Sequence, residues 1–563
     1  MHYSKKPWLK SYKLGPYKLK ETMAPYPEVA IFKALEEAVE NHPGKTAVLF
    51  EGRTLKYSEL GNQSDRFASA LCKMGIQKGE RVSIFMQNCM EYIISVWGIQ
   101  KAGGVMVPTS TLRSDDGIVH ETGNSSSRVI VCQEKNLERI LAVKDRCGVE
   151  HVIVTSDEGY DVAPISKSLP KGVYAFNQLI ENNDPNLPRL QIDPKEDLCE
   201  LPYTGGSTGL PKAVMVTHYS RYCNLMQFMP WMLAPMAPGI IGKASVLIPL
   251  PLFHVFGHCI HQAAVLWGMR IILLKDPRDI DKLVSTIKEY RPFLIPLVPT
   301  QLMRLAQAKI GRMNAMFVSG SAPLPDEVRQ AVQKEMGNPV GESYGLTETG
   351  PGTHTDLSGF GRITGFMARE KKSIGVPLPD TDCKVLDPGT GNEVPPGEKG
   401  EIVVRGPQIM KGYWPKAGKG LTENGWLHTG DVGFMDEDGY FFLSDRIKDM
   451  VNVSGMKVYT TAVDDVLFKH PAVFMAAAFG VPDPNNPGSE RVMAVIQLKE
   501  AARGKTTKAD IVNYCKENME PYAVPKFVEF RDELPTTVTG KLFKRRLRED
   551  AVAGFKQRGM IAH

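Results

Sequence analysis

A loop rich in glycine and hydroxyl side chains lies in the first half of the chain. Residues 203–212 read YTGGSTGLPK, so three glycines, a serine and two threonines precede a lysine. Glycines let backbone N–H groups approach an anion, hydroxyls donate further hydrogen bonds, and the lysine adds positive charge. The loop therefore predicts a cradle for the phosphates of a nucleotide. A plain turn between two strands is the alternative interpretation.

The spacing of this loop differs from that of the phosphate loop in P-loop NTPases. That motif has a glycine directly before the lysine and a serine or threonine directly after it. Here Pro211 precedes Lys212 and Ala213 follows it. Proline disfavours helical geometry at Leu210, and a strand-like run follows the loop where a P-loop has a helix. The sequence thus predicts phosphate binding without kinase-type architecture.

Five further segments, in order along the chain, resemble signature motifs of the adenylate-forming superfamily, as does the loop itself. This superfamily includes acyl-CoA synthetases, adenylation domains of peptide synthetases and beetle luciferases. The segments are 317–324 (FVSGSAPL), 344–348 (YGLTE), 426–431 (WLHTGD), 444–449 (SDRIKD) with 453–459 (VSGMKVY), and 535–547 (PTTVTGKLFKRRL). The spacing and the C-terminal half are most similar to those of bacterial fatty-acyl-CoA synthetases.

The resemblance implies a ligase that works in two steps with ATP, Mg²⁺ and coenzyme A. A carboxylate attacks the α-phosphate of ATP, pyrophosphate leaves, and the resulting acyl-adenylate is attacked by a thiol. Such phosphoryl-type transfer is catalysed mainly by positioning and charge stabilisation. We therefore expect cations, a metal ligand and nucleotide contacts, with no protein nucleophile required. Both steps are reversible in principle.

The resemblance also assigns roles to single residues. Lys541 corresponds to the catalytic lysine that stabilises charge between the carboxylate and the α-phosphate, although a solvated basic tail is the alternative. Glu348, with Thr208, corresponds to the Mg²⁺ site. Asp431 is expected to accept both ribose hydroxyls, because a carboxylate only accepts hydrogen bonds. Tyr344 is expected to stack on adenine. The other residues implied at the nucleotide are Thr204, Gly205, Gly206, Ser207, Gly209, Lys212, Gly320, Ser321, Ala322, Glu342, Ser343, Gly345, Thr347, Leu443 and Arg446.

A hinge and a thiol-binding face are implied in the last quarter of the chain. Lys448 corresponds to the hinge, about which a small domain would rotate to replace Lys541 by the face that contains Ser454, Gly455 and Met456. Two features depart from the family pattern. Ala213 stands where the phosphate loop ends in glycine, and the proline and glutamate of the usual VYPxE segment are Thr460 and Ala462. The second departure concerns the thiolation face.

The segment FHVFGHCIH at 253–261 has three interpretations: a metal site, a lining of the acid pocket, or histidines that pack in the interior or lie at the surface. On a helix, His254, His258 and His261 share one face, a spacing that a metal could use. The resemblance instead places His254 beside the carboxylate of the acid. The expected acid pocket consists of Trp231, His254, Val255, Gly257, Gly350 and Pro351. The region 226–236 is rich in methionine and aromatic residues, an adaptable apolar lining, and no fixed cation is evident. This favours an apolar acid: fatty, alicyclic or aromatic.

The elements that must position these residues follow an alternating pattern. Strand-like runs occur at 46–50, 81–86, 104–108, 128–132, 151–155, 213–217, 246–250 and 271–274, with amphipathic segments such as 58–74 between several of them. Ser58 is the expected N-cap of that helix. Alternation of this kind predicts an α/β fold with mostly parallel sheets covered by helices, and two doubly wound units fit in residues 30–375.

The pattern of predicted strands and helices changes near residue 375 and again near 444–448. Short runs such as 382–386 and 401–405, bounded by Gly/Pro turns, predict a small antiparallel sheet or β-barrel. Helices mixed with strands at 476–481 and 492–498 predict a smaller, mobile α+β domain. We expect an N-terminal domain at 1–445 with the ATP and acid sites, and a C-terminal domain at 446–563 with the catalytic lysine and the thiol face.

Composition narrows the partners and leaves several functions open. A net charge of +5 over 563 residues argues against nucleic acid as main partner. Nine dispersed cysteines without a CxxC motif, together with an N-terminus that lacks a signal-like apolar run, predict a reducing, cytoplasmic location. No run is long enough to span a membrane; peripheral contact, and a monomer or homodimer, stay open. Alternatives to an acyl-CoA synthetase are loading of a carrier-protein thiol, a luciferase-like monooxygenase and a non-catalytic nucleotide-binding regulator.

Overall fold

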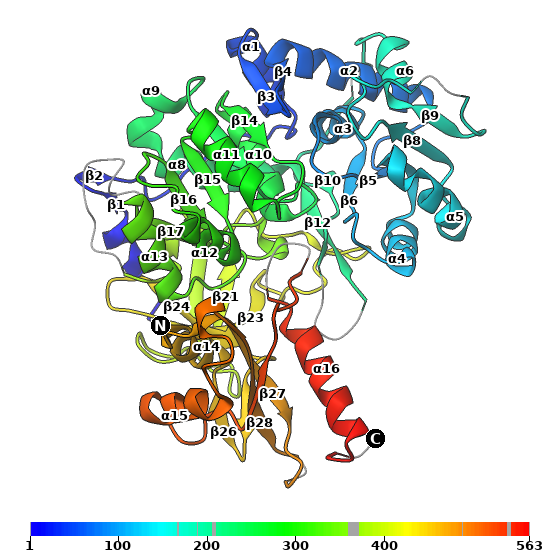
Figure 1. The fold of residues 1–563 in the computed structure, drawn as a ribbon. Helices are drawn as coiled ribbons and strands as arrows, with labels where there is room; N and C mark the ends of the chain where they lie inside the picture. The colour runs from blue at the N-terminus through cyan, green and yellow to red at the C-terminus, as the bar shows by residue number, and fades with distance from the viewer. Residues whose placement is uncertain are drawn as a thin grey trace.

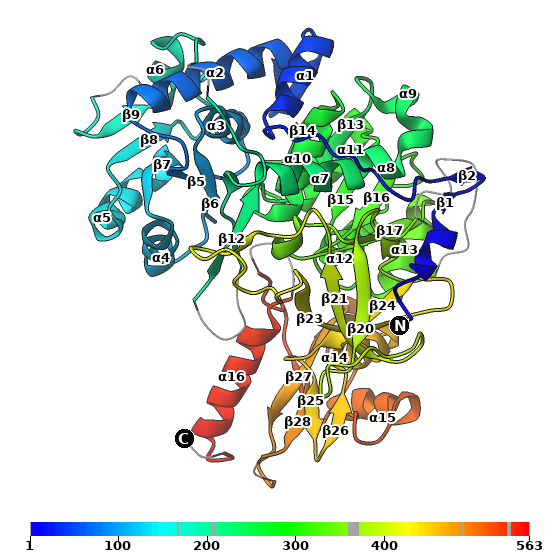
Figure 2. The same cartoon turned by 180° about the vertical axis from the view of Figure 1, so that it is seen from behind.

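Two nine-stranded sheets form the core of the larger part of the molecule, and helices cover their faces (Figure 1). The computed structural model describes residues 2–165, 168–187, 190–204, 210–357, 371–486, 488–537 and 542–561. In the view from behind, the blue and cyan sheet and the green sheet lie side by side above the yellow segments (Figure 2). This agrees with the predicted α/β fold.

The first sheet has the order β11-β12-β10-β6-β5-β7-β8-β9, and β22 also pairs with β12. Its centre is parallel, whereas β12 runs antiparallel to β10, β11 and β22. The strands are β5 (Arg81–Phe85), β6 (Val105–Pro108), β7 (Ser127–Gln133), β8 (His151–Thr155), β9 (Val173–Ala175), β10 (Leu198–Glu200), β11 (Tyr203–Thr204), β12 (Lys212–Thr217) and β22 (Gly412–Tyr413).

The second sheet has the order β19-β18-β17-β16-β15-β13-β14-β3-β4, with antiparallel strands only at its two edges. Every residue of β13, β15 and β16 is buried, as expected for parallel strands covered on both faces. The strands are β3 (Thr46–Phe50), β4 (Arg53–Lys56), β13 (Ser245–Ile248), β14 (Arg270–Leu273), β15 (Leu294–Leu297), β16 (Met316–Ser319), β17 (Val340–Tyr344), β18 (His354–Thr355) and β19 (Val376–Pro377).

The helices around these sheets are amphipathic or fully buried according to their position. They are α1 (Lys33–Asn41), α2 (Tyr57–Lys73), α3 (Met90–Lys101), α4 (Asp115–Ser125), α5 (Leu137–Cys147), α6 (Phe176–Glu181), α7 (His218–Gln227), α8 (Met229–Met232), α9 (Ala237–Ile240), α10 (Val255–Leu266), α11 (Ile280–Tyr290), α12 (Pro299–Gln307) and α13 (Asp326–Met336). Within the described ranges, none of the helices is long and apolar enough to cross a bilayer.

The start of α2 corrects one expectation. Ser58 is not the N-cap: the helix begins at Tyr57, and Lys56 is the capping residue. The Glu59 carboxylate accepts a hydrogen bond from the Lys56 N–H at 2.7 Å. The side chain at the third helical position therefore supplies the acceptor of a capping box. A lysine at the cap position is an unfavourable signal for sequence-based assignment.

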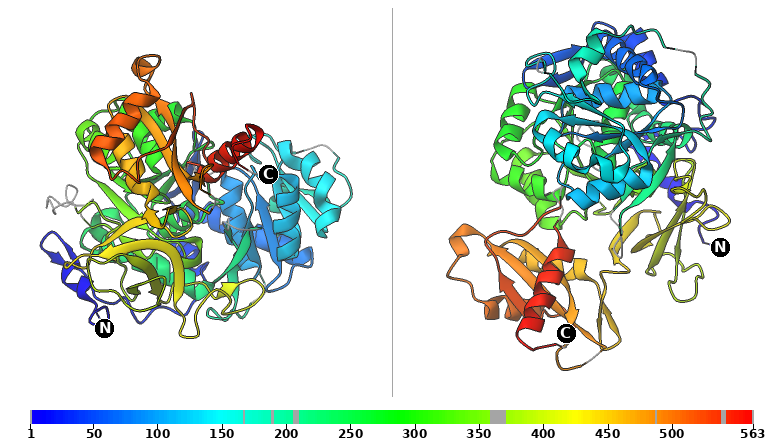
Figure 3. Two further views of the ribbon diagram at one scale, coloured as in Figure 1. Left: turned by 90° about the horizontal axis from the view of Figure 1, so that it is seen from below. Right: turned by 90° about the vertical axis from the view of Figure 1, so that its right-hand side faces the viewer.

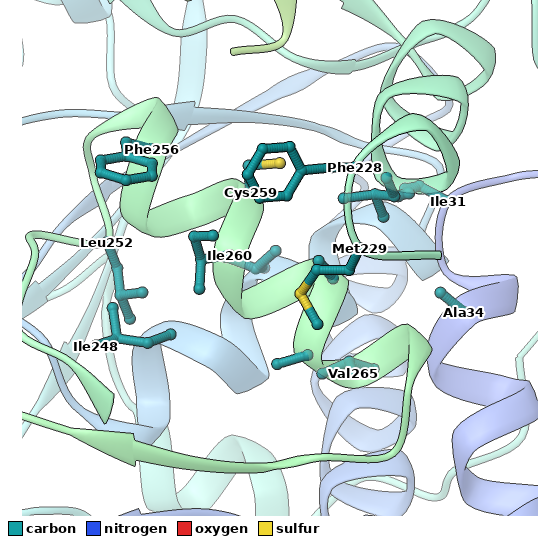
Figure 4. Close-up of a cluster of buried hydrophobic side chains, with 14 of the residues drawn as sticks. Ile31, Ala34, Phe228, Met229, Ile248, Leu252, Phe256, Cys259, Ile260 and Val265 are labelled. Carbon is teal, nitrogen blue, oxygen red and sulfur yellow. The ribbon is translucent and has the colours of Figure 1, made fainter. Parts of the chain in front are cut away.

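Helix α10 lies in the middle of the largest apolar cluster. The cluster joins this helix to the junction of α7 and α8: it includes Phe256, Cys259 and Ile260 of α10 together with Phe228 and Met229 (Figure 4). Nearly every residue of α10 is buried, which fits a helix that is apolar around most of its circumference. Its few polar side chains therefore have to find partners inside the protein.

The chain after the second sheet forms the two smaller units that the change in the pattern of strands and helices predicts. The first is a four-stranded antiparallel sheet in the order β20-β21-β23-β24, made of β20 (Asp382–Leu386), β21 (Gly400–Arg405), β23 (Leu427–Met435) and β24 (Phe441–Arg446). The second, in orange and red, lies below the main body in the right-hand view of Figure 3. It contains β25 (Val451–Val453), β26 (Met456–Val458), α14 (Thr460–Lys469), β27 (Val473–Pro482), β28 (Glu490–Leu498), α15 (Lys508–Asn518), β29 (Phe527–Phe530) and α16 (Lys544–Gln557). The exact domain boundary at 445/446 stays a prediction.

Candidate functional site

The predicted phosphate loop connects two paired strands of the first sheet. Thr204 of β11 faces Lys212 of β12, so the two ends of the loop are held together by the antiparallel ladder. A strand follows the loop, as the sequence predicts. Gly205, Gly206, Ser207, Thr208 and Gly209 lie outside the described residues. Lys212 is exposed at the start of β12.

Helix α4 contacts both ends of this loop. One ring nitrogen of His120 donates to the carbonyl of Pro211 at 2.9 Å, and the hydroxyl of Tyr203 donates to the side-chain oxygen of Asn124 at 2.8 Å. The indole of Trp414 donates to the Asn124 carbonyl at 3.1 Å. None of these contacts was predicted, because a lone histidine or asparagine on a helix carries no signal for a partner that is distant in the sequence.

Tyr413 lies between Lys212 and Glu348. Strand β22 pairs with β12 and places Tyr413 opposite Val214. The Lys212 ammonium lies 5.2 Å from the centre of the Tyr413 ring, and the Tyr413 hydroxyl donates to a Glu348 carboxylate oxygen at 2.6 Å. Burial, followed by the charge of Glu348, raises the pKa of Tyr413, so the phenol remains a donor. The structure therefore brings two predicted site residues to one ring that the sequence did not single out.

Glu348 suits a magnesium ion that also binds phosphate. It lies half-buried in the 3₁₀ turn η4 (Thr347–Thr349), which Thr347 opens. Mg²⁺ is commonly held by one or two carboxylates, with waters and substrate phosphates completing its octahedron. No cluster of three metal-ligating side chains occurs in the described parts of the chain. A single protein carboxylate beside a phosphate loop fits this ion better than a site built from protein ligands alone.

Three predicted nucleotide residues meet at Asp431. The hydroxyl of Tyr344, at the end of β17, donates to one Asp431 oxygen at 2.7 Å. The guanidinium of Arg446 lies 2.9 Å from the other oxygen, because Asp431 and Arg446 face each other on β23 and β24. Burial, followed by Asp431, raises the pKa of Tyr344 well above its usual value. A carboxylate has about four acceptor positions, so Asp431 retains capacity for two ribose hydroxyls.

The backbone around the expected adenine pocket leaves no space for larger residues. A Cβ at Gly345 would lie 1.6 Å from the Pro351 carbonyl oxygen, and one at Gly320 would lie 3.0 Å from the Phe256 ring. Ser321 has a φ of +73°, a conformation unusual for a residue with a side chain. Ala322 follows it in the same turn. The constraints at Gly320 and Ser321 restrict the segment that connects β16 to α13, and the constraint at Gly345 restricts the segment after β17.

Two other residues expected at the adenine are engaged within the protein. The carboxylate of Glu342 is buried, pairs with Arg329 at 2.7 Å and accepts from the Leu324 N–H at 3.3 Å. Burial raises the pKa of Glu342 to about 7. The hydroxyl of Ser343 lies 3.2 Å from that of Thr355 on β18. In this arrangement both side chains support strand β17. Leu443, on β24, lies opposite Gly433 of β23.

The residues of the expected acid pocket have different surroundings. The Trp231 indole is buried and donates to the Lys20 carbonyl at 2.7 Å, edge-on to Tyr12, so it anchors the N-terminal segment. His254 is the N-cap of α10, where its ring accepts from the Phe256 N–H at 3.3 Å. Val255 is buried, and a Cβ at Gly257 would lie 2.7 Å from the Pro251 carbonyl oxygen.

The histidines of α10 form hydrogen bonds within the protein. His258 lies 2.8 Å from a carboxylate oxygen of Glu200, and a ring nitrogen of His261 donates to the His258 carbonyl at 2.8 Å. Their helical spacing therefore serves internal contacts in this structure. The partners Glu200 and Arg221, which form a buried ion pair behind Gly350, were not predicted. The available signal for Glu200 was its charge within the otherwise apolar run 198–201.

The predicted thiol face is the exposed turn between β25 and β26. Ser454 and Gly455 both have positive φ, at +52° and +90°, and the side chain of Met456 is exposed. Lys448 is exposed in the connection between β24 and β25. Lys541, with Thr539 and Gly540, lies outside the described residues.

Thr460, which replaces the proline of the family pattern, bridges β24 and the small unit. Its N–H donates to the carboxylate of Asp445, and its hydroxyl accepts from Lys544 at 3.0 Å. Lys544 also pairs with Asp464 at 2.6 Å. A proline could not donate the first of these bonds. The departure therefore has a structural use next to the predicted hinge.

Comparison with known proteins adds independent information. Residues 35–414 match the family model described as "AMP-binding enzyme", and residues 462–541 match the one described as "AMP-binding enzyme C-terminal domain". The chain is 32% identical to a long-chain-fatty-acid–CoA ligase of Bacillus subtilis and 33% identical to one of Escherichia coli O6:H1. Each of these alignments covers 97% of this chain and 98% of the relative.

A solved structure supports the same fold over nearly the whole chain. The anthranilate CoA ligase AuaEII in complex with anthranoyl-AMP is 25% identical, with a TM-score of 0.83. The alignment covers 96% of this chain and all of that one. The similarity therefore includes both the large α/β part and the smaller C-terminal unit.

Proposed function

Because the chain belongs to the AMP-binding enzyme family and is an acid–thiol ligase, we propose that it is an AMP-forming acyl-CoA synthetase for an apolar carboxylic acid. The observation that carries the proposal is the meeting of distant motifs at one place. Lys212, Tyr413 and Glu348 form one contact chain, and Tyr344, Asp431 and Arg446 form another. The two triads suit the phosphates and the ribose of one nucleotide.

In the first step, an oxygen of the carboxylate attacks the α-phosphorus of ATP. The bond from this phosphorus to the bridging oxygen breaks, and pyrophosphate leaves. The loop at 203–212 holds the departing phosphates, Asp431 fixes the ribose, and Lys541 stabilises charge at the α-phosphate. Glu348 would hold a Mg²⁺ ion, which would supply charge neutralisation at the phosphates.

In the second step, the thiol of coenzyme A attacks the carbonyl carbon of the acyl-adenylate. AMP leaves, and the thiol proton passes to solvent. One site must first hold pyrophosphate and then admit a thiol, which favours a rotation of the unit 446–563 about Lys448. The exposed turn at 454–456 is then presented to coenzyme A. The reverse reaction uses the same groups.

The apolar surroundings support an apolar acid. Helix α10 contributes to a cluster of buried aliphatic, aromatic and methionine side chains (Figure 4). The buried cation Arg221 is neutralised by Glu200 and is therefore not free to select a second carboxylate. The two curated relatives are named as ligases of long-chain fatty acids, which puts these acids first for testing, with alicyclic and aromatic acids next.

A panel of carboxylic acids tests the proposal. The protein is incubated with ATP, Mg²⁺, coenzyme A and one acid, and pyrophosphate, AMP and acyl-CoA are measured. We expect the three products in equal amounts with apolar acids and little turnover with dicarboxylic acids. Release of pyrophosphate without acyl-CoA, followed by transfer to a phosphopantetheinyl carrier protein, would favour carrier loading instead. No pyrophosphate with any acid would contradict both functions.

A further inference from the structure

A buried ion pair lies directly behind the site. The carboxylate of Glu200, at the end of β10, bonds to the guanidinium of Arg221 on α7, and both side chains are essentially inaccessible to solvent, at 1% and 0% exposure. A buried ion pair adds little net stability, because the cost of removing two charges from water offsets their attraction. Its presence in the interior therefore calls for a role other than stability.

Glu200 is held by α10 as well as by α7. Its other oxygen lies 2.8 Å from a ring nitrogen of His258 and 3.1 Å from the side-chain nitrogen of Gln262. Burial alone would raise the pKa of Glu200, but Arg221 and then His258 hold it well below its usual range. Glu200 is thus a fixed carboxylate with donors from two helices, and it determines the direction of the Arg221 side chain.

Arg221 uses a second nitrogen to reach the loop that carries Glu348. This nitrogen donates to the carbonyl of Gly350, two residues beyond Glu348. Asn224, on the same face of α7, contacts Gly352 twice: its amide donates to the Gly352 carbonyl at 3.0 Å, and its oxygen accepts from the Gly352 N–H at 3.4 Å. Helix α7 therefore fixes the backbone on both sides of Pro351.

The same loop is held from its other side at Glu348. The Tyr413 hydroxyl donates to the Glu348 carboxylate, and the Met410 N–H donates to the Glu348 carbonyl at 2.9 Å. The segment 410–413 thus fixes both the side chain and the main chain of Glu348. The loop 348–352 therefore lies between two sets of contacts, and the loss of either set would allow the Glu348 carboxylate to shift.

We propose that Arg221 is a positioning residue for the adenylation step: it fixes the Gly350 carbonyl, and through it Glu348 and the Gly350–Pro351 wall of the acid pocket. Glu200, supported by His258 and Gln262, keeps the guanidinium aimed at this carbonyl. The inference rests on the proposed function, and it explains why α10 places polar side chains inside an apolar cluster. Positioning of this kind matters because small displacements of a metal ligand or a reacting acid reduce rate strongly.

The test compares four variants with a matched control. One or both charges are removed in Arg221→Met, Glu200→Gln and the double variant Glu200→Gln/Arg221→Met. Arg221→Lys keeps the positive charge but lacks the guanidinium group that reaches two acceptors at once. Lys101→Met is the control, because Lys101 is 6% exposed and forms an ion pair with Asp65 at 2.6 Å that links α3 to α2. ATP–pyrophosphate exchange is measured at varied ATP, Mg²⁺ and acid, together with Tm.

A positioning role and a stabilising role for the ion pair predict different results for these variants. Arg221→Met should lower kcat/KM for exchange at least about tenfold and raise the Mg²⁺ concentration for half-maximal exchange. The double variant should regain much of the Tm lost in the single variants, because it leaves no buried unpaired charge, yet stay as impaired in exchange as Arg221→Met. Arg221→Lys should be intermediate, and Lys101→Met should lower Tm alone.

Two results would overturn the inference. Recovery of exchange in the double variant along with Tm would assign the pair to stability. An unchanged Mg²⁺ dependence in Arg221→Met would show that Arg221 does not position Glu348. These outcomes differ from failure of the proposed function, in which the wild-type protein itself would exchange no pyrophosphate with any acid.

Discussion

The proposed nucleotide side of the molecule and its proposed thiol side are built differently. At the nucleotide side, Tyr344, Asp431 and Glu348 already have hydrogen-bond partners within the protein. At the thiol side, Lys448 and the turn at 454–456 are exposed. A site that stabilises developing charge benefits from groups fixed in advance, whereas a face that is used only after a rotation has to remain accessible. The contrast predicts that substitutions on the two sides affect different half-reactions.

The largest effect is expected at Lys541. Lys541→Ala should reduce adenylation by orders of magnitude, because it removes the charge that stabilises the α-phosphate transition state. Thioester formation from supplied acyl-adenylate should be retained. Both half-reactions are measured separately, by pyrophosphate release and by acyl-CoA formation. Lys544→Gln is a suitable control in the same basic segment, since Lys544 pairs with Asp464. Equal loss of both half-reactions in Lys541→Ala would remove this assignment.

Lys448→Pro tests the other side of the comparison. A proline fixes φ and resists the rotation that the hinge must allow. Pyrophosphate release in the first turnover should be preserved, whereas conversion of acyl-adenylate to acyl-CoA should nearly stop. Lys448→Ala, which keeps the backbone free, should behave like the wild-type protein. An unchanged overall rate in Lys448→Pro would contradict a hinge at this position.

Tyr413→Phe examines how much the fixed nucleotide side depends on one hydroxyl. The change removes the hydrogen bond to Glu348 and keeps the ring beside Lys212. A hydrogen bond to a charged group contributes about 1.5–3 kcal/mol, so kcat/KM for MgATP should fall about tenfold or more. Thioester formation from supplied acyl-adenylate should change little. Trp414→Phe, at the neighbouring position, controls for the loop. A loss equal in both half-reactions would indicate general distortion.

The sequence reveals these motifs because each motif is continuous along the chain. The residue types at 203–212 predicted a phosphate loop, the resemblance to a known family singled out the YGLTE segment, and the strand that follows the loop is present as β12. Tyr413, Arg221 and His120 could not be found in this way, since each acts through a partner that the fold brings from far away, such as Gly350 for Arg221. Glu342 shows the converse: it lies beside Tyr344 in the motif, yet in the structure its carboxylate pairs with Arg329.

The smallest expected effect is at His120, where α4 supports the nucleotide side from outside. His120→Ala removes the donor to the Pro211 carbonyl at one end of the phosphate loop. A neutral hydrogen bond of this kind contributes about 1 kcal/mol net, so the KM for ATP should rise only about two- to fivefold, with kcat nearly unchanged. His120→Gln can still donate and should recover much of the loss. A rise in the KM for the acid or for coenzyme A, with an unchanged KM for ATP, would contradict this prediction. Helix α4 would then support a different part of the site, despite its contacts with Tyr203 and Pro211 at the ends of the phosphate loop.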